Sequence, residues 1–140
     1  MVPKAPAQSN AKVPRTPRAP APSRRLHSIL TKPGDGAGIA YVAGATLSTD
    51  FPVTKGALRA TNNGFFDGFV TRLSATGGAV PYSTLFGGKD SEWFWAIGLD
   101  GVNACYVAGA GYGGSPTTVN AIQAVHAGNT DGIVLELTTW

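Results

Sequence analysis

Residues 41–45 read Tyr-Val-Ala-Gly-Ala, and the same five residues return at 106–110. An Asp-Gly dipeptide precedes each copy, at 35–36 and at 100–101, so that the offset is 65 residues. From residue 52 onward the offset is 64, and 16 of 33 aligned positions are identical in the two copies. Self-similarity at one nearly fixed spacing indicates a duplicated structural unit.

Each copy contains short stretches with the alternation of apolar and polar residues that is typical of β-strands. Asp67 opens one such stretch, in which Phe69, Thr71 and Leu73 share a face, and glycine-rich turns separate the stretches. The predicted strands are 39–45, 67–74, 80–86, 93–99, 104–110 and 131–138. The long connections at 46–66 and 111–130 contain segments, 54–61 and 118–127, where we expect one or two helical turns.

The expected fold is all-β, with antiparallel four-stranded β-propeller blades in a partial, incomplete ring. A β-solenoid is the competing repeat architecture, but its coils are usually shorter than this spacing. We place repeat one at 34–99 and repeat two at 100–140, so that 34–140 forms one β-propeller repeat segment.

Residues 1–33 have a different composition from the rest of the chain. Residues 1–25 hold six of the eleven basic residues, six of the ten prolines and no acidic residue, while residues 26–140 hold five basic and eight acidic residues. A segment with so few large apolar residues cannot offset the entropy lost on ordering, so we expect a disordered basic tail at 1–33. Nucleic-acid contact through this tail is an alternative function, but the dispersed charges without interleaved aromatic residues favour a solvated linker.

The composition also excludes several classes of protein. One cysteine cannot form a disulfide within the chain, and no apolar run is long enough for a membrane-spanning helix. No apolar stretch of signal-peptide length follows the basic residues of the tail. Since no nucleophile, phosphate-loop or metal-ligand motif is present either, we expect no enzyme activity, no cofactor and no metal site.

The recurring positions are interpreted as structural. Asp67 and Asp131 each precede a glycine and an apolar strand, where a carboxylate commonly accepts backbone N–H bonds; a ring of cation ligands is the alternative. Gly44 and Gly109 are expected to mark bulges or a close approach of two backbones. The full set of expected structural positions is Tyr41, Gly44, Asp67, Gly68, Tyr106, Gly109, Asp131 and Gly132.

The segment Glu92-Trp93-Phe94-Trp95 carries the only candidate ligand-binding residues. Alternation along a strand places Trp93 and Trp95 on one face, where they would stack on a sugar, with Glu92 as the conceivable acid of a glycan-cleaving site. The competing interpretation is that the tryptophans belong to the core between neighbouring blades.

The stretches 40–57 and 67–88 resemble the bacterial β-propeller repeat known as the SBBP repeat. The family pattern appears as YVAG at 41–44, STDFPVTKGA at 48–57, DGFVTRL at 67–73 and YSTLFGG at 82–88. The second copy departs from it, with Gly114-Ser115-Pro116 in place of an Asp-Phe-Pro. The resemblance implies a large exported or surface-associated bacterial protein, and it supplies no catalytic residues.

About 1.7 repeats are present, because 26–34 shows nothing like the strand at 91–99 and the second copy stops before its last strand. Propellers need about four to eight blades to close. We therefore expect other propeller blades as partners, from copies of this chain or from a longer parent, and a marginal fragment is the remaining alternative. The expected function is a non-catalytic scaffold or binding surface for a protein or glycan ligand.

Overall fold

The computed structural model describes residues 26–33, 38–101 and 104–138, and within these ranges it contains strands and no helix. The strands are β1 (Leu26–Pro33), β2 (Ala40–Thr46), β3 (Asp67–Leu73), β4 (Tyr82–Phe86), β5 (Glu92–Leu99), β6 (Cys105–Gly111) and β7 (Asp131–Leu137). The predicted all-β class is confirmed, and β2 to β7 lie within two residues of the predicted strands.

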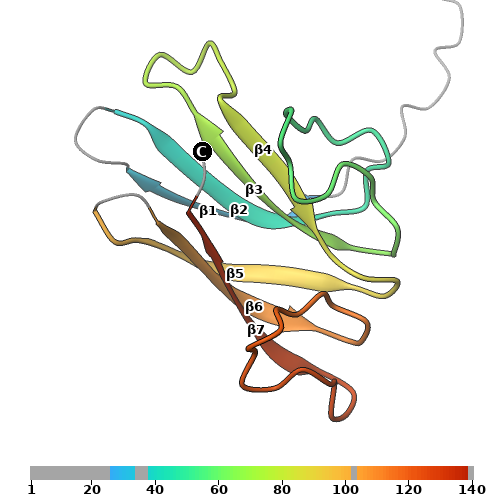
Figure 1. The fold of residues 1–140 in the computed structure, drawn as a ribbon. Coiled ribbons are helices and arrows are strands. Elements are labelled where there is room, and N and C mark those ends of the chain that lie inside the picture. The colour runs from blue at the N-terminus through green and yellow to red at the C-terminus, as the bar shows by residue number, and fades with distance from the viewer. Residues whose placement is uncertain (1–25, 34–37, 102–103, 139–140) are drawn as a thin grey trace, which may run out of the picture.

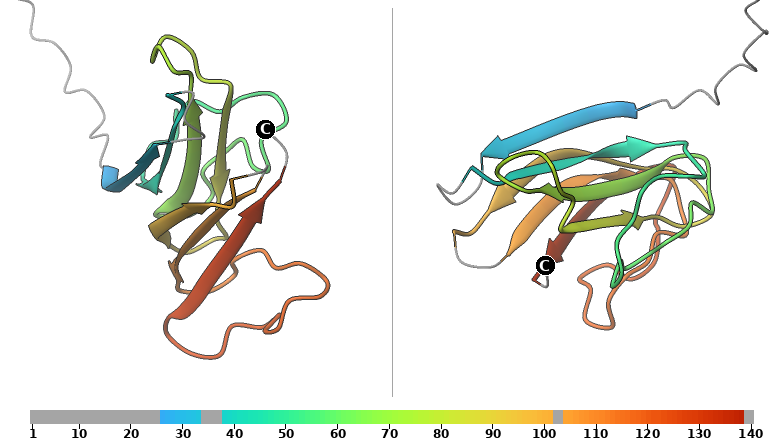
Figure 2. Two further views of the ribbon diagram at one scale, coloured as in Figure 1. Left: turned by 90° about the vertical axis from the view of Figure 1, so that its left-hand side faces the viewer. Right: turned by 90° about the horizontal axis from the view of Figure 1, so that it is seen from above.

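The strands form two antiparallel sheets that pack face to face (Figure 1). The first sheet has the order β1-β2-β3-β4 and the second has the order β5-β6-β7. Strand β5 lies against β1, β2 and β3, and the left-hand view of Figure 2 shows the sheets as neighbouring layers.

The two copies of the repeated sequence fold in the same way. Tyr41 pairs with Arg72 between β2 and β3, and its repeat counterpart Tyr106 pairs with Glu136 between β6 and β7. All seven paired positions of β2 and β3 have counterparts in the same register in β6 and β7. The internal repeat in the sequence is therefore a repeat in structure.

Strand β1 corrects two expectations. Residues 26–33 do not belong to a disordered tail, and the first copy does not lack its opening strand. Leu30 pairs with Ala43, as Ala96 pairs with the counterpart Ala108, so β1 occupies the place of β5. The pairing is made through backbone groups, which is why it needs no sequence similarity between the two strands. Residues 1–25 of the expected tail lie outside the described residues.

The boundary between the structural units also differs from the predicted one. The sequence repeat divides the chain at 99/100, but β5 pairs with β6 and thus belongs to the second sheet. The structural units therefore separate in the turn between β4 and β5. Each unit begins with the strand that precedes the repeated Tyr-Val-Ala-Gly-Ala segment.

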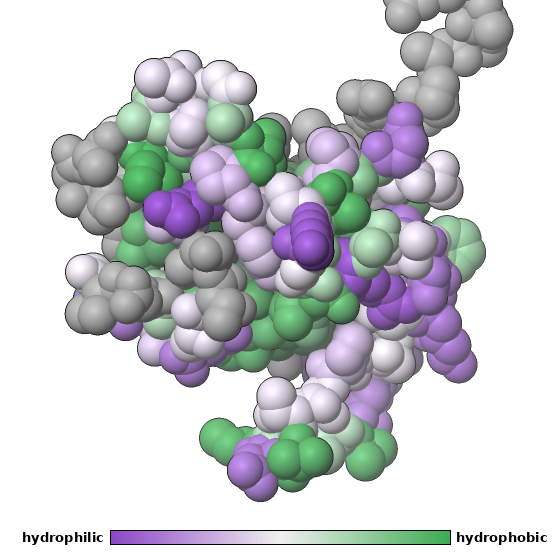
Figure 3. All heavy atoms as spheres, turned by 45° about the horizontal axis from the view of Figure 1, so that its top comes forward, coloured by the Kyte–Doolittle hydropathy of each residue, from purple (hydrophilic) through white to green (hydrophobic). Residues whose placement is uncertain are grey.

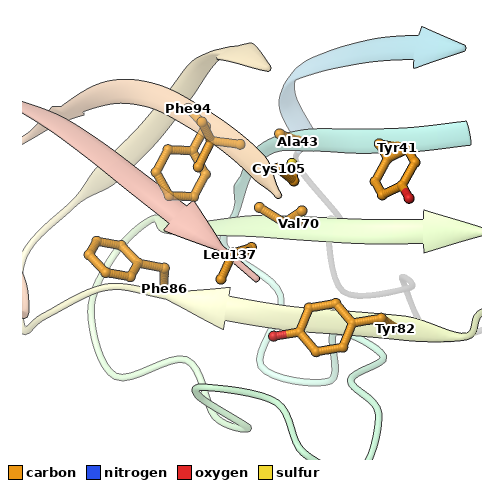
Figure 4. Packing of buried hydrophobic residues seen from close by; sticks show 9 residues of the cluster. Tyr41, Ala43, Val70, Tyr82, Phe86, Phe94, Cys105 and Leu137 are labelled. Atoms are coloured by element: carbon orange, nitrogen blue, oxygen red, sulfur yellow. The ribbon is translucent and has the colours of Figure 1, made fainter. Parts of the chain in front are cut away.

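Opposite faces of the two sheets meet in the core. We call the face of the first sheet that carries Tyr41, Ala43, Gly68 and Val70, together with Tyr82 and Phe86 of β4, face A; the other face of the sheet is face B. Face A packs against Phe94, Cys105, Val107 and Leu137 of the second sheet (Figure 4). Because Cys105 and Leu137 are the repeat counterparts of Ala40 and Leu73, which lie on face B of the first sheet, the second sheet contributes its own face B.

Face A of the second sheet is left open as a result. Tyr106 and Val134 are 40% and 78% exposed, whereas their counterparts Tyr41 and Val70 are 7% and 0% exposed. Tyr106 donates a hydrogen bond to its cross-strand partner Glu136 (3.1 Å). In the first sheet the equivalent partner of Tyr41 is Arg72, whose guanidinium lies over the Tyr41 ring. The tyrosine of this cross-strand pair is thus buried in the first sheet and exposed in the second.

The long connections do not form the helical turns that we expected at 54–61 and 118–127. The N–H of Thr54 donates to the Ser83 carbonyl (3.0 Å), and the Leu85 N–H donates to the Arg59 carbonyl (3.1 Å). Segment 54–59 therefore runs along the outer edge of β4 and uses its backbone groups there. Backbone hydrogen bonds to the edge strand satisfy this segment better than a short helix would, because an isolated helix of one or two turns is only marginally stable.

Gly109 confirms the expected close approach of two backbones. A Cβ atom at this position would overlap the carbonyl of Trp93 on β5. The β5–β6 register shifts between Phe94 and Ala96, opposite Gly109 and Ala108, so the glycine lies at a β-bulge.

We expect Gly68→Ala to destabilise the fold. A Cβ on Gly68 would lie 2.7 Å from the ring of Phe94, which is fully buried and cannot move aside. Overpacking of this kind typically lowers the free energy of unfolding by about 1–3 kcal/mol. Urea denaturation of the variant and the wild type measures the difference.

The repeat supplies a matched control, Gly132→Ala. Gly132 is the counterpart of Gly68, and a Cβ there would meet nothing within 4 Å. The control should unfold like the wild type, within about 0.5 kcal/mol. Equal destabilisation by both substitutions would refute the assignment of Gly68 to a tight sheet-to-sheet contact.

Candidate functional site

The β-bulge on β5 separates the two tryptophans that were expected to form a platform. Phe94 pairs with Gly109 and Ala96 with Ala108, so Trp95 is the extra residue of the bulge. Its side chain is 58% exposed. Trp93 is half-buried in an aromatic group with Phe66 and Tyr112, whose ring centroids lie 5.7 Å and 5.3 Å away.

Glu92, the third residue of the expected glycan site, is fully buried. Its carboxylate accepts a hydrogen bond from the Ser115 hydroxyl (2.7 Å). Glu92, Trp93 and Trp95 therefore do not form one surface that is open to a sugar. Glycan binding at Trp95 stays a prediction.

Asp67 and Asp131 occupy equivalent positions but have different surroundings. Asp131 is partly exposed and accepts hydrogen bonds from the Ala127 N–H and the Gln123 side chain (both 2.8 Å), as expected of a carboxylate in a turn. Asp67 is fully buried, and neither of its carboxylate oxygens accepts a hydrogen bond of normal geometry. The expected turn role thus describes Asp131 and not Asp67.

Stacking of the sheets brings Asp67 and Glu92 together. A Cβ added to Gly87 would overlap an oxygen of Asp67 and lie 2.7 Å from Oε2 of Glu92, so both carboxylates flank this glycine. Oε2 of Glu92 has no hydrogen-bond partner either. A side chain at position 87 would leave no room for the pair.

The charge of Arg59 acts on both carboxyls of this pair. Its guanidinium donates a hydrogen bond to the Gly87 carbonyl, which lies beside both carboxylates. Burial raises the pKa of Asp67 above its ordinary value of 3.8, and the charge of Arg59 and the nearby Asn63 N–H oppose the rise only in part. Burial also raises the pKa of Glu92 above 4.5, against the Ser115 hydrogen bond, and the charge of Asp67 raises it further. The junction therefore favours a bound proton.

A groove of about 990 Å³ lies directly over this junction. Three of its lining residues belong to the junction. Ser115 donates to Glu92, Gly87 lies between the two carboxylates, and Arg59 donates to the carbonyl of Gly87. The groove runs between the long connections of the two repeats, with β7 as one wall. Its lining is mainly apolar, and Arg59 is the only charged residue in it.

Sequence reasoning considered Glu92 and Asp67 separately and missed that they form a pair. The two residues are 25 positions apart, one at the start of β3 and the other at the start of β5. A backbone hydrogen bond from the Glu92 N–H to the Phe66 carbonyl (2.7 Å) joins these two strand ends, and no motif of fixed spacing encodes this tertiary contact. The adjacent glycines at 87 and 88 are the one sequence signal near this junction, but a glycine pair after a strand indicates a turn and not a carboxyl pair.

Three further observations concern the described ranges. No three His, Cys, Asp or Glu side chains within them are grouped closely enough to hold a metal ion. No helix in these ranges has the length and apolar character needed to cross a membrane. The nucleic-acid alternative concerns basic residues at 1–25, which lie outside the described residues.

No family model matches the chain, and no curated protein matches it either.

We expect the stability of the protein to fall as the pH rises from about 4 toward neutrality. Carboxyls with a raised pKa bind protons more tightly in the folded chain than in the unfolded chain, so their contribution is largest below their ordinary values of 3.8 and 4.5. It is lost as the pH rises through the raised values. Asp67→Asn should flatten this dependence, because it removes one of the two carboxyls whose pKa is raised by burial.

Urea denaturation at a series of pH values between 4 and 8 measures this effect. Asp131→Asn is the matched control at the exposed counterpart, and it should keep the slope of the wild type. A wild-type slope in Asp67→Asn would contradict the proposed protonation of the pair.

Proposed function

We propose that this chain is a β-propeller repeat segment that acts as a non-catalytic scaffold and binding surface. Its sheets are blades in this proposal, and further blades pack on them in the same sense. The sequence resemblance to the bacterial SBBP repeat supports this reading, as does the internal repeat in the same register. The resemblance also suggests that the chain belongs to an exported or surface-associated bacterial protein.

One observation carries the proposal, namely that face A of the first sheet packs on face B of the second. Such an interface joins two different surfaces, so a sheet that packs through its face B leaves its own face A exposed for the next sheet. Ala108 on face A of the second sheet is partly exposed, whereas its counterpart Ala43 is fully buried. Two-fold packing of like faces would have left no such copy.

A further blade would present its face B to this surface. On the first sheet, face B carries Val42, Thr71 and Leu73, all of them partly exposed. Their counterparts in the second sheet are Val107, Leu135 and Leu137, which pack against the first sheet. The first sheet of a second copy therefore offers the chemistry that face A of the second sheet lacks.

Light scattering after size exclusion tests the proposal on the full chain, with far-UV circular dichroism on the same peak. We expect a discrete β-rich oligomer whose mass is a multiple of 14.4 kDa. Ala108→Arg should shift it to the monomer, because a long charged side chain prevents close packing of the sheets.

Ala79→Arg is the matched control, since Ala79 lies exposed in the turn before β4 and outside both faces. It should leave the oligomer unchanged. A folded wild-type monomer at every concentration, or an oligomer that ignores Ala108→Arg, would contradict the proposal.

A further inference from the structure

The groove lies beside an unpaired strand edge. In the first sheet, β3 has β2 on one side and β4 on the other. Its counterpart β7 pairs with β6, and no strand among the described residues pairs with its other edge. The backbone N–H and C=O groups of such an edge are available to another extended chain.

The first repeat shows how the corresponding place is filled. There β4 lies between β3 and segment 54–59, which contacts β4 through backbone and hydroxyl groups. Ser83 accepts from the Thr54 N–H (3.0 Å) and donates its own N–H to the Thr54 hydroxyl (2.9 Å). The Leu85 N–H donates to the Arg59 carbonyl (3.1 Å).

Two walls of the groove correspond to the two neighbours of β4 in the first repeat, and residues 58–61, 63 and 85–87 of the first repeat line the rest of it. One wall is 132–135 of β7, the counterpart of 68–71 in β3, and the other contains Thr118, Ile122 and Gln123, the counterparts of Thr54, Leu58 and Arg59. These residues all line the groove. The cavity is therefore the second repeat's version of the place that β4 occupies in the first.

The second connection forms the same turn as the connection that holds β4. The Ala57 N–H donates to the Thr54 carbonyl in the first repeat (3.1 Å), and the Ala121 N–H donates to the Thr118 carbonyl in the second (3.1 Å). The turn thus forms where no strand among the described residues fills the groove. Preorganisation of this kind lowers the entropic cost of binding.

The second connection carries apolar side chains that are exposed to solvent, and one of them, Ile122, lines the groove. Val119, Ile122 and Val125 of the second connection are 100%, 109% and 78% exposed. The lobe at the lower edge of Figure 3 shows hydrophobic groups at its surface. Exposed apolar groups gathered at one rim are typical of a binding surface.

We propose that this groove is the binding site for an extended, uncharged peptide segment with the residue pattern of β4, which adds to β7 as an antiparallel strand. The pattern is a hydroxyl residue at the position of Ser83, an apolar residue at that of Leu85 and an aromatic residue at that of Phe86. Main-chain bonds to a free edge provide affinity, and alternate side chains provide specificity. The inference rests on the proposed function only in treating the two sheets as copies of one unit.

A synthetic peptide with the sequence of residues 79–88 is the probe, labelled with a fluorophore and titrated with the full chain. Fluorescence anisotropy should report saturable binding of one peptide per chain. A scrambled peptide should not bind. A peptide methylated at the amide of Leu85 should bind about tenfold more weakly, because it loses the bond that is equivalent to the one with Arg59.

Variants of the chain locate the site. Ile122→Asp should weaken binding of the peptide about tenfold, since it places a charge in an apolar wall, and its full exposure leaves the fold intact. Val80→Asp is the control at an exposed apolar residue outside the groove, and it should bind like the wild type. Hydrogen exchange should show protection of amides in 131–137 when the peptide is bound.

Absence of saturable binding, equal binding of the scrambled peptide, or protection confined to other strands would overturn the inference. Ala108 does not line the groove, so Ala108→Arg should bind the peptide normally. Loss of the oligomer with retained peptide binding separates the two proposals. A chain that assembles but ignores the peptide would refute this one alone.

Discussion

The architecture depends on the contact between the Phe94 ring and the bare backbone of Gly68. The ring is fully buried, and only a residue without a side chain lets the first sheet approach it this closely. Burial of an aromatic ring contributes about 1.5–3 kcal/mol, so the contact is a large part of a small core. It fixes which faces meet, because Gly68 lies on face A and Phe94 on face B.

The polar junction and the groove follow from the same contact. Asp67 precedes Gly68, and Glu92 lies two residues before Phe94, so the stacking that buries the ring also carries both carboxyls out of water. Gly87 and Gly88 follow β4 at this point, and a Cβ at position 88 would overlap the carbonyl of Gly114 in the second connection. The two long connections thus meet above the carboxyls and enclose the groove. A change in the spacing of the two sheets would therefore alter both the carboxyl junction and the groove.

The sequence permitted the prediction of the repeat, of six strands and of the glycine at the bulge, because alternation and repetition are local properties. It did not reveal β1, since backbone pairing with β2 leaves no side-chain pattern to compare with β5. Strict alternation placed Trp93 and Trp95 on one face, and the bulge beside Ala96 broke it. The carboxyl pair and the groove arise where two repeats touch, so their geometry depends on tertiary packing that neither copy encodes alone.

The head-to-tail interface between the sheets has a direction. The two ends of any stack of such units differ in chemistry: one end presents face B and the other presents face A. The rotation that the interface imposes from one unit to the next determines whether a stack closes into a ring with a fixed number of units or continues as an open helix. A unit with only one of the two faces intact could join a stack but would end it. In an open stack such a terminal unit would therefore control the length, whereas in a closed ring the shared interface itself sets the number of units.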